Sequence, residues 1–401
     1  MSHDLLLHEE HGEAVASWFR LDYRSETVAC FDRHLDLKPL PAAAATALRD
    51  AADDPEAVAG LNRQGPLREA PGAYGLDDFW AAGPVLGAVD RLLWVTPDDS
   101  GDSRARREAL MRTVSLIRTD PGVLDVTRFV DGALHTYLCG LQLEVHSPRS
   151  FVPRMRLLPE ARVDVDLDWF FHPMSGLERS PSEMITLLDL AEARGRLDSL
   201  TFSVRSGFLP ESHRYLAGDL ADLTGRRLGV VARTVADDGH AELLAALAAG
   251  ELPPTAEEAD SGLGLTIAGL TALQQGQLAE AAACWERSTA GGGSTWLAYK
   301  IGVTLFEAGR HDDALGWLDR ARGEELDTLE AHAAVLRCLC LLRGAGGPAS
   351  LGTDLRQLLD RYPLHLGVVR CAHTAAESEG DGDLRALALD RARQLAALVK
   401  P

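Results

Sequence analysis

The sequence predicts a layered α/β domain with a mostly parallel sheet, followed by a domain made only of helices. In residues 4–240, short apolar strand-like runs alternate with helix-like segments, a pattern typical of parallel strands joined by helices. A polar stretch with adjacent prolines then interrupts the pattern, and beyond it apolar residues recur at helical spacing alone. We therefore predict a three-layer α/β domain at residues 1–249, a linker at 250–262 and a helical domain at 263–401.

The elements of the α/β domain follow from this alternation. The strand-like and helix-like segments are, in chain order, Asp4–His8, Gly12–Arg20, Thr27–Phe31, Val85–Asp90, Arg91–Val95, Arg162–Asp168, Ser182–Arg194, Leu200–Val204 and Glu211–Leu223. In a parallel sheet, functional groups collect just beyond the carboxyl ends of the strands. Polar side chains that directly follow a strand-like run are therefore the first candidates for a site.

The composition is that of an ordinary globular chain and argues against two classes of partner. Of the 401 residues, 46% are hydrophobic and 25% are charged, which suggests two or three domains. The 60 acidic and 40 basic residues give a net charge of −20, which opposes binding to nucleic acid or anionic lipid. No apolar run approaches the roughly 18 residues of a membrane span, and the six cysteines form no CxxC pair. We expect a cytoplasmic protein with reduced cysteines and no nucleic-acid or membrane partner.

Two short acidic clusters, Asp32–Asp36 and Asp164–Asp168, are the main functional signal. Each follows an apolar run and repeats ligand-type side chains at every second residue, as Asp, His and Asp in the first and three Asp in the second. In an extended chain such residues point to one side, where carboxylates repel each other unless cations or protons neutralise them. Carboxylate and imidazole ligands suit a divalent cation such as manganese. A solvated loop or an edge strand could show the same alternation of polar and apolar residues. Solvated faces, however, usually mix acids with Lys, Thr and Ser.

The helical region contains an internal repeat. The segment Gly276–Ala281 recurs 33 residues later as Gly309–Ala314, and a bulky residue follows each copy, Trp285 in the first and Trp317 or Leu318 in the second. This resembles the tetratricopeptide repeat, a unit of about 34 residues in which two helices meet at a turn. Such arrays usually present a concave face to a peptide or protein. Further helices are predicted at Leu326–Leu342, Leu355–Tyr362, Leu366–Ser378 and Asp383–Val399, the last as a cap.

The metal-type motifs resemble those of the ureohydrolase superfamily, which includes arginase and agmatinase. The Asp-x-His-x-Asp of Asp32–Asp36, an Asp-x-Asp within Asp164–Asp168 and His11 at a strand-to-helix junction are the family's three elements. Over residues 4–240 the chain is similar to a divergent arginase-like branch that includes bacterial peptide arginases, which convert arginine side chains of ribosomal peptides into ornithine. The segments Asp77–Pro97, Asp166–Phe170 and Ser203–Gly207 also carry this likeness.

The resemblance implies an arginase/deacetylase-like fold and a site with two manganese ions. Carried over by position, the ligands of the first motifs are Asp32 as the bridge, His34 on one ion, and His11 and Asp36 on the other. Family members carry Ser-x-Asp-x-Asp before two apolar residues, which makes Asp166 and Asp168 ligands and places Asp164 at the serine position. In the alternative register, the ligands are Asp164 and Asp166.

The chain departs from arginase at the positions that would act on the substrate. Arginases carry a histidine in an Asn-x-His-Gly loop, whereas Asp77 and Asp78 stand at the nearest counterpart here. Either is a candidate for the proton carrier or for a guanidinium clamp, and Asp78 is equally a candidate N-cap of a helix at Phe79–Leu86. Arg205 stands near the position of the substrate-binding glutamate. It could bind a carboxylate of the substrate or the protein, or brace a metal-binding aspartate.

These observations predict a two-metal hydrolase that converts arginine into ornithine and urea, on a peptide or protein docked by the helical repeats. His146 and His172 are further catalytic candidates, since both could reach a site at the strand ends. Two alternatives stay open: an amide hydrolase of the deacetylase type on the same fold, and an adaptor whose metal-binding domain is not catalytic. An acid facing the pocket opposite the metals would favour the guanidino substrate.

Overall fold

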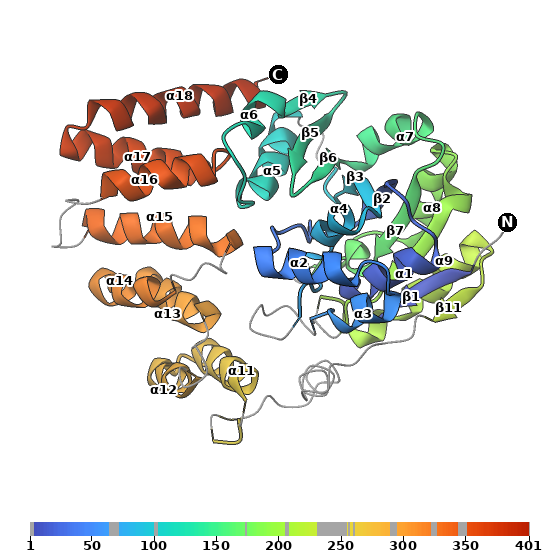
Figure 1. The fold of residues 1–401 in the computed structure, drawn as a ribbon, viewed down its shortest axis with the longest axis horizontal. Helices are drawn as coiled ribbons and strands as arrows, with labels where there is room; N and C mark the ends of the chain where they lie inside the picture. Colours follow the sequence, from blue (N-terminus) through green and yellow to red (C-terminus); the bar gives the residue numbers. More distant parts are fainter. Residues whose placement is uncertain are drawn as a thin grey trace.

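The α/β domain is built on a nine-stranded, mostly parallel sheet (Figure 1). The computed structural model describes residues 4–63, 72–99, 103–172, 175–204, 208–230, 255, 257–259, 261–288, 295–321, 327–343 and 351–400. In spatial order the strands are β11 (Leu228–Val230), β1 (Leu5–His8), β10 (Leu197–Thr201), β7 (Arg162–Asp166), β2 (Glu26–Phe31), β3 (Val89–Val95), β6 (Leu141–His146), β5 (Ala133–Leu138) and β4 (Arg128–Val130). Neighbours from β11 to β6 pair in parallel, and β5 and β4 continue the sheet antiparallel. The predicted mostly parallel sheet is confirmed.

Helices cover both faces of the sheet because its central strands are apolar on both sides. In β2, Val28 and Cys30 belong to one buried core, whereas Ala29 and Phe31 belong to the other. The first core contains residues of α1 (Ala14–Arg20), α2 (Ala42–Ala51), α3 (Pro55–Gly60), α4 (Ala82–Leu86) and α5 (Ser103–Ser115). The second contains residues of α7 (Pro148–Arg156), α8 (Pro181–Leu190) and α9 (Tyr215–Thr224). The α/β domain therefore has three layers.

Short elements complete this domain and carry several of the polar residues. They are the 3-10 turns η1 (His11–Glu13), η2 (Phe79–Ala81), η3 (Leu167–Phe170), η4 (Arg194–Arg196) and η5 (Glu211–His213), the helix α6 (Val123–Val126), and the hairpin of β8 (Phe171–His172) and β9 (Gly176–Leu177). Most of these turns directly precede or follow a strand or helix, so they redirect the chain at the edges of the sheet.

Several predicted boundaries were wrong: the helix predicted to reach Arg194, for example, ends at Leu190. Three of the differences have a clear local reason. The strand predicted to reach Asp168 ends at Asp166, where η3 begins. β10 begins at Leu197 rather than Leu200, because Tyr23, Arg162 and Arg226 satisfy the buried carboxylate of Asp198. The predicted segment Val85–Asp90 is divided, because Gly87, with φ of 65°, ends α4 and lets β3 begin at Val89.

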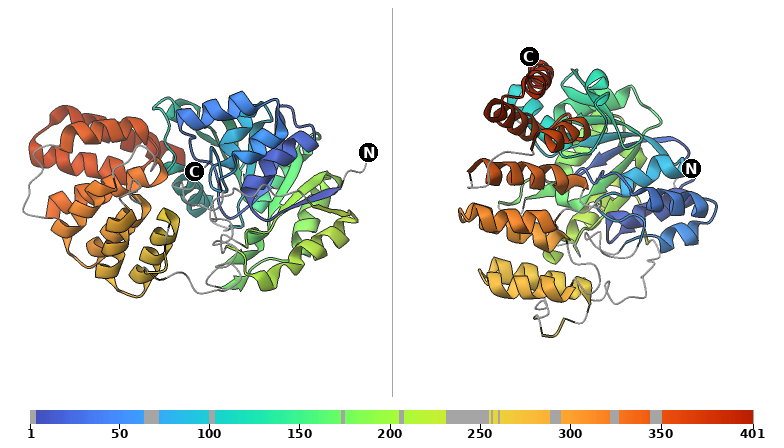
Figure 2. Two further views of the ribbon diagram at one scale, coloured as in Figure 1. Left: turned by 60° about the horizontal axis from the view of Figure 1, so that its bottom comes forward. Right: turned by 60° about the vertical axis from the view of Figure 1, so that its left-hand side comes forward.

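The C-terminal region is all-helical, as predicted. Its helices are α11 (Gly262–Gln274), α12 (Leu278–Ser288), α13 (Thr295–Glu307), α14 (His311–Arg320), α15 (Asp327–Arg343), α16 (Leu351–Arg361), α17 (Leu366–Glu379) and α18 (Gly382–Val399). Figure 2 shows α11, α13 and α15 as successive layers. The repeated glycines Gly276 and Gly309 have φ of 76° and 74° in the turns of the pairs α11–α12 and α13–α14. The predicted linker lies mostly outside the described residues.

The left-handed turn at Gly309 gives a direct test of the repeat. Replacing Gly309 with alanine should lower the free energy of unfolding by about 1 kcal/mol, because a Cβ is strained at this φ. Among the described residues, apart from the two chain neighbours, no heavy atom lies within 4 Å of the Cβ position, so the added methyl group meets no steric clash there. Gly316→Ala, inside α14 and also in open space, is the matched control and should raise stability by roughly 0.5–1 kcal/mol. Chemical denaturation measures both, and equal effects would contradict the assigned turn.

The helical array is fixed to the α/β domain through its C-terminal end. One hydrophobic core contains Leu110 and Val114 of α5 together with Leu359 of α16 and Leu395 of α18. The backbone N–H of Thr119 donates to the carbonyl of Arg361 at 2.9 Å. β1 begins beside the N-terminus on the right of Figure 1 and runs toward the helices on the left, so the carboxyl ends of the parallel strands lie on the side of the array (Figures 1 and 2).

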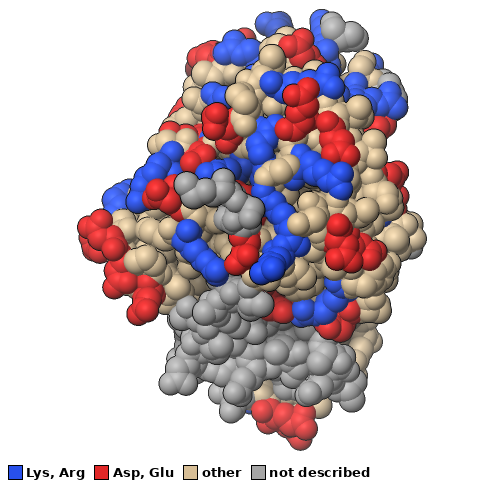
Figure 3. Space-filling view, turned by 90° about the vertical axis from the view of Figure 1, so that its right-hand side faces the viewer, with Lys and Arg blue, Asp and Glu red and all other residues tan. Residues whose placement is uncertain are grey.

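The opposite side, near the start of β1, has a mixed charged surface. Figure 3 shows acidic and basic side chains interspersed there, with several basic side chains near the centre. At the amino ends of the strands, Arg162 and Arg226 each lie 3.4 Å from the buried carboxylate of Asp198. The six cysteines are free, and no helix in the described part of the chain is long and apolar enough to cross a membrane.

Candidate metal centre

The sheet register brings the acids of β7 beside polar groups of its two neighbours. Val163 and Val165 belong to the second core, so Asp164 and Asp166 point to the opposite face. Cys30 of β2 and Ser199 of β10 both pair with Asp164 in register, one on each side. β7 lies between β10 and β2, which makes the edge-strand interpretation of this acidic alternation wrong. The acids therefore face the interior of the domain rather than a solvent-exposed edge of the sheet.

The first acidic cluster is a turn rather than an extended segment. β2 ends at Phe31, the backbone N–H of His34 donates to Asp32 Oδ1 at 2.7 Å, and Asp36 has φ of 46°. Asp168 likewise lies in the η3 turn, where its N–H donates to Asp166 Oδ1 at 3.0 Å. In an extended chain, the Cα atoms of alternate residues are about 6.6 Å apart, and the two turns bring these acids closer together.

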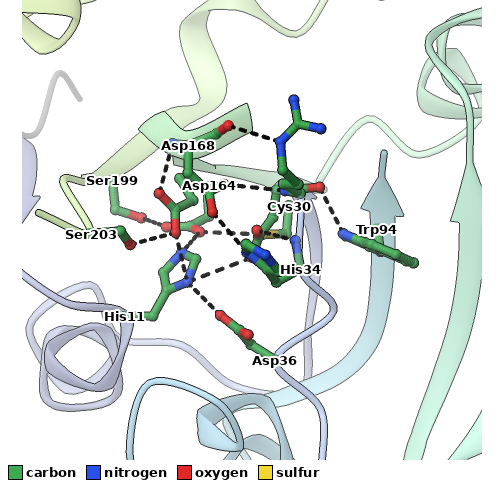
Figure 4. Close-up of polar contacts among 12 residues, drawn as sticks. His11, Cys30, His34, Asp36, Trp94, Asp164, Asp168, Ser199 and Ser203 are labelled. Carbon is green, nitrogen blue, oxygen red and sulfur yellow. Dashed lines mark hydrogen bonds and ion pairs between the residues drawn. The ribbon is translucent and has the colours of Figure 1, made fainter. Parts of the chain in front are cut away.

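His11 lies at the centre of the cluster (Figure 4). It opens η1, directly after β1, and its side chain is only 1% exposed. Its Nδ1 lies 3.0 Å from Asp36, 3.3 Å from Asp166 and 3.6 Å from Asp32, measured to Oδ2 in each case. Its Nε2 faces the other way, 3.5 Å from Oδ2 of Asp164. The ring stacks on Phe79 with centroids 4.6 Å apart.

His34 occupies the outer side of the cluster. Its Nδ1 lies 2.8 Å from Oδ2 of Asp168, and its side chain is 39% exposed, whereas that of Asp168 is 1% exposed. The ring packs against Phe208 with centroids 4.5 Å apart. The backbone N–H of Arg33 donates to Asp168 Oδ1 at 3.3 Å, and its side chain pairs with Glu178 at 2.7 Å. Solvent therefore reaches the cluster at His34.

Two groups of ligand-type side chains overlap at Asp32. One group is His11, Asp32 and Asp166; the other is Asp32, His34 and Asp168; within each, the ligand atoms lie within 4.8 Å of one another. A third group, His11, Cys30 and Asp164, lies deeper. These buried residues could hold a metal ion, and the predicted ligands His11, Asp32, His34, Asp36, Asp164, Asp166 and Asp168 all lie in one cluster.

The unpaired atoms of the cluster fit a cation. Asp32 is fully buried, and its Oδ2 has no hydrogen-bond partner among the described residues. Buried carboxylate oxygens are rarely left without a partner, because the desolvation penalty is large. The other acids are partly satisfied by donors that fix their direction, such as Ser203 Oγ, which donates to Asp166 Oδ2 at 2.6 Å. Oxygen and imidazole ligands in this arrangement suit a hard or borderline divalent cation.

The carboxylates differ in electrostatics. Burial, together with the charges of Asp36 and Asp168, raises the pKa of Asp32 well above its ordinary value. Burial and Asp168 raise the pKa of Asp166 to about 7. For Asp164, burial alone would raise the pKa, but the contacts with His11 and Ser199 bring it below its ordinary value. Burial and the neighbouring carboxylates therefore outweigh the effect of His11 at Asp32 and Asp166, whereas the contacts with His11 and Ser199 outweigh burial at Asp164.

Asp77 and Asp78 have basic partners away from the cluster. Asp78 is fully buried, accepts from the N–H of Gly75 at 2.7 Å, and lies 2.6 Å from the guanidinium of Arg63. Asp77 lies between Lys38, at 2.6 Å, and the same Arg63, at 3.2 Å. Asp78 stands at the N-cap position of η2, but its side chain makes no capping hydrogen bond there. This arrangement suits a brace for the loop that precedes η2.

The remaining predicted site residues lie on other elements. His146 ends β6, where it contacts Glu144 at 3.2 Å and Ser150 at 3.1 Å. His172 lies in the hairpin after η3, near enough to Glu178 to help lower the pKa of that carboxyl. Arg205 lies outside the described residues. The structure gives His146 structural partners and leaves His172 near the outer side of the centre.

Several residues at the centre were not predicted as site residues. Ser199 and Ser203 donate to Asp164 and Asp166, Phe79 packs on His11, and the indole N–H of Trp94 donates to the carbonyl of Asp32 at 3.0 Å. The alternation of Ser199, Thr201 and Ser203 in an otherwise apolar segment was the available signal. It indicates a strand that turns one polar face toward buried partners.

A hollow of about 510 Å³ lies next to the outer side of the centre. Its lining residues are Arg33, Pro97, Asp98, Asp99, Glu178 and Arg179. Glu178 pairs with Arg33, and Asp99 lies 3.0 Å from Arg149. Because these acids already have basic partners, the hollow alone does not select a cationic substrate.

Comparison with known proteins found no matching family model, curated protein or solved structure. The function of the chain is therefore inferred from the residues of the candidate metal centre and from the arrangement of the helical array around it.

Proposed function

We propose that the chain is a metal-dependent hydrolase that cleaves a guanidino group with the help of two divalent cations of the manganese class. The observation that carries the proposal is the overlap of two ligand groups at Asp32. A carboxylate has two oxygens and can contact two ions at once. Asp32 is fully buried between the two groups, which suits a bridging role.

The proposed ligands divide between the two ions. His11, Asp36 and Asp166 would hold the inner ion, and His34 and Asp168 the outer one, with Asp32 on both. Such a pair of ions supplies a water-derived nucleophile near neutral pH and neutralises the charge that develops during attack. The reaction consumes one water, breaks the bond between the side-chain nitrogen and the guanidino carbon, and releases urea and the amine of ornithine.

The protein residues hold and orient this centre. Ser203 and the backbone N–H groups of Arg33 and His34 fix three of the carboxylates at 2.6–3.3 Å. Phe79 and Phe208 pack on the two imidazoles and limit their rotation. His34 is the partly exposed ligand, so a substrate would approach from its side. His172 remains the candidate proton carrier on that side.

The helical array supports a peptide or protein as the substrate. The array is fixed to the α/β domain through α16 and α18, and it stands on the side where the parallel strands end (Figure 2). Repeats of paired helices commonly bind extended peptides. Free arginine would need no such surface. We therefore expect the enzyme to act on arginine within a longer chain.

The first experiment loads the purified protein with manganese and compares arginine-containing peptides with free arginine. Urea release with conversion of the peptide arginine to ornithine, detected by mass spectrometry, is the expected result. Chelator-treated protein should release none, because the nucleophile requires the ions. Bound manganese without urea from any arginine substrate would contradict the guanidino hydrolase.

An amide hydrolase on the same centre is the second candidate. The observation that favours it is the pairing of Asp77 and Asp78 with Lys38 and Arg63, which leaves neither acid positioned to clamp a guanidinium. Acetyl-lysine peptides assayed with the same manganese-loaded or zinc-loaded protein distinguish the two reactions. If metal binds and neither substrate is hydrolysed, a non-catalytic adaptor becomes the better account.

A further inference from the structure

We infer that Asp164 is a positioning residue for His11: its carboxylate holds the Nε2 edge of the ring, so that Nδ1 is presented to the acids of the metal centre. The inference rests on the proposed metal centre and assigns a role to an acid that the sequence placed among the candidate ligands. It concerns the geometry of the site, so it holds whichever C–N bond the centre cleaves.

The two nitrogens of His11 face different partners. Nδ1 lies within 3.6 Å of Asp32, Asp36 and Asp166. Nε2 lies 3.5 Å from Oδ2 of Asp164, without hydrogen-bond geometry, and has no hydrogen-bond partner among the described residues. Phe79 stacks on the ring and fixes its plane, but a 180° flip of the ring keeps this plane and exchanges Nδ1 for a carbon atom. A carboxylate on the Nε2 side disfavours this flip and favours the proton on Nε2, which leaves Nδ1 free for the cation. Histidines that bind metals usually donate their other N–H to such a group.

Asp164 is itself held from both sides. Ser199 Oγ donates to Oδ1, and the thiol of Cys30 lies 3.5 Å from Oδ2. Both neighbours pair in register with Asp164 across three adjacent strands, so their positions are set by the sheet rather than by a loop. Supporting residues on strands hold a site more rigidly than residues on loops. Cys30, Asp164 and Ser199 therefore form a fixed row beside His11 (Figure 4).

Position along β7 separates Asp164 from the ligands. Asp164 precedes Asp166 by two residues, which places its Cα about 6.6 Å deeper in the sheet. Its side chain is 4% exposed, and Oδ1 is already occupied by Ser199. Direct binding of a cation by His11, Cys30 and Asp164 is the competing interpretation, because these three also lie close together. The two interpretations predict different responses to removal of His11.

The test measures binding of manganese and cobalt by calorimetry, with the visible spectrum of bound cobalt as a second readout. Asp164→Asn should weaken the ion held by His11 by about 10–100-fold, the range found when a partner of a metal-binding histidine is lost. In a His11→Gln background one ion should remain on Asp32, His34 and Asp168. Adding Asp164→Asn to that background should leave its affinity and spectrum unchanged.

Two further variants complete the design. Ser199→Ala removes a donor to Asp164 and should produce a smaller loss in the same direction, so the inference stays testable if Asp164→Asn folds poorly. Asp198→Asn is the matched control, because Asp198 is a fully buried carboxylate of β10 that is held by Tyr23, Arg162 and Arg226 and does not belong to the described ligand groups. It should lower stability without changing metal affinity.

The outcomes separate this inference from the proposed reaction. Unchanged metal affinity in both Asp164→Asn and Ser199→Ala would overturn the positioning role. A further loss of metal affinity when Asp164→Asn is added to His11→Gln would also overturn it, because that result would make Asp164 a direct ligand. Wild-type protein that binds no divalent cation removes both proposals together. Metal binding with the expected pattern but no urea supports the role of Asp164 and contradicts only the guanidino reaction.

Discussion

Replacing Asp32 with asparagine is expected to lower the hydrolytic rate by about 10³-fold or more, because a catalytic ion contributes several kcal/mol to the transition state and each 1.36 kcal/mol is a factor of ten. Asp32 is the residue that the two ligand groups share, so its loss would affect both proposed ions at once. An amide of the same size keeps the packing, and its carbonyl oxygen still accepts the N–H of His34. The expected metal content falls from two equivalents to one or fewer.

The measurement pairs urea release with metal analysis of the same protein samples. Glu144→Gln is the matched control: Glu144 is a buried carboxylate on β6 with Arg154 and His146 as partners, and it does not belong to the described ligand groups. It should lose stability and keep its metal. An Asp32→Asn protein that retains two ions and full activity would rule out the bridging assignment.

The gathering of these acids and histidines was predictable because two simple rules act together. Strand ends of a parallel sheet collect functional groups, and a buried cluster of like charges implies a compensating cation. The exact arrangement was not predictable. Asp36 reaches His11 only because its backbone adopts a φ of 46°, and Asp168 reaches His34 only because η3 replaces the last part of the predicted strand. Such turns depend on the hydrogen bonds that the acids themselves accept.

Asp77 and Asp78 show what the sequence leaves open. Their position after a glycine and before a helix is compatible with capping, with catalysis and with ion pairing. Arg63 decides between these roles: it is 14 residues from Asp77 and 15 from Asp78 in the sequence, and it lies buried beside both. The attachment of α18 to α5 likewise depends on residues that are distant in the sequence. The glycine spacing predicted the repeats, but the docking depends on apolar residues from segments that are distant in the chain.

The metal-free protein is expected to become less stable as the pH rises from about 5 to 7. The pKa of Asp166 is raised to about 7 and that of Asp32 is raised well above its ordinary value, whereas in the unfolded chain both titrate near 4. Between these values the folded state binds more protons, so the free energy of unfolding falls with pH, by up to about 1.36 kcal/mol per pH unit for each group. His11, whose pKa is raised well above 6.5 by the surrounding acids, extends the fall to higher pH.

Divalent cations should reverse this trend, because a bound ion replaces the protons that the acids otherwise need. Added manganese is expected to stabilise the protein strongly at pH 7 and weakly at pH 5, with a gain of about 2.7 kcal/mol when the ion is present at 100 times its dissociation constant. Chemical denaturation of chelator-treated and manganese-loaded protein at pH 5, 6 and 7 measures both effects. Asp166→Asn is the control, since it removes one titrating group and should flatten the metal-free curve. Two results would contradict this account: a metal-free protein that gains stability between pH 5 and 7, or an Asp166→Asn variant whose free energy of unfolding depends on pH as in the wild type. Either result would show that the charge of these carboxyls is compensated by something other than protons or a cation.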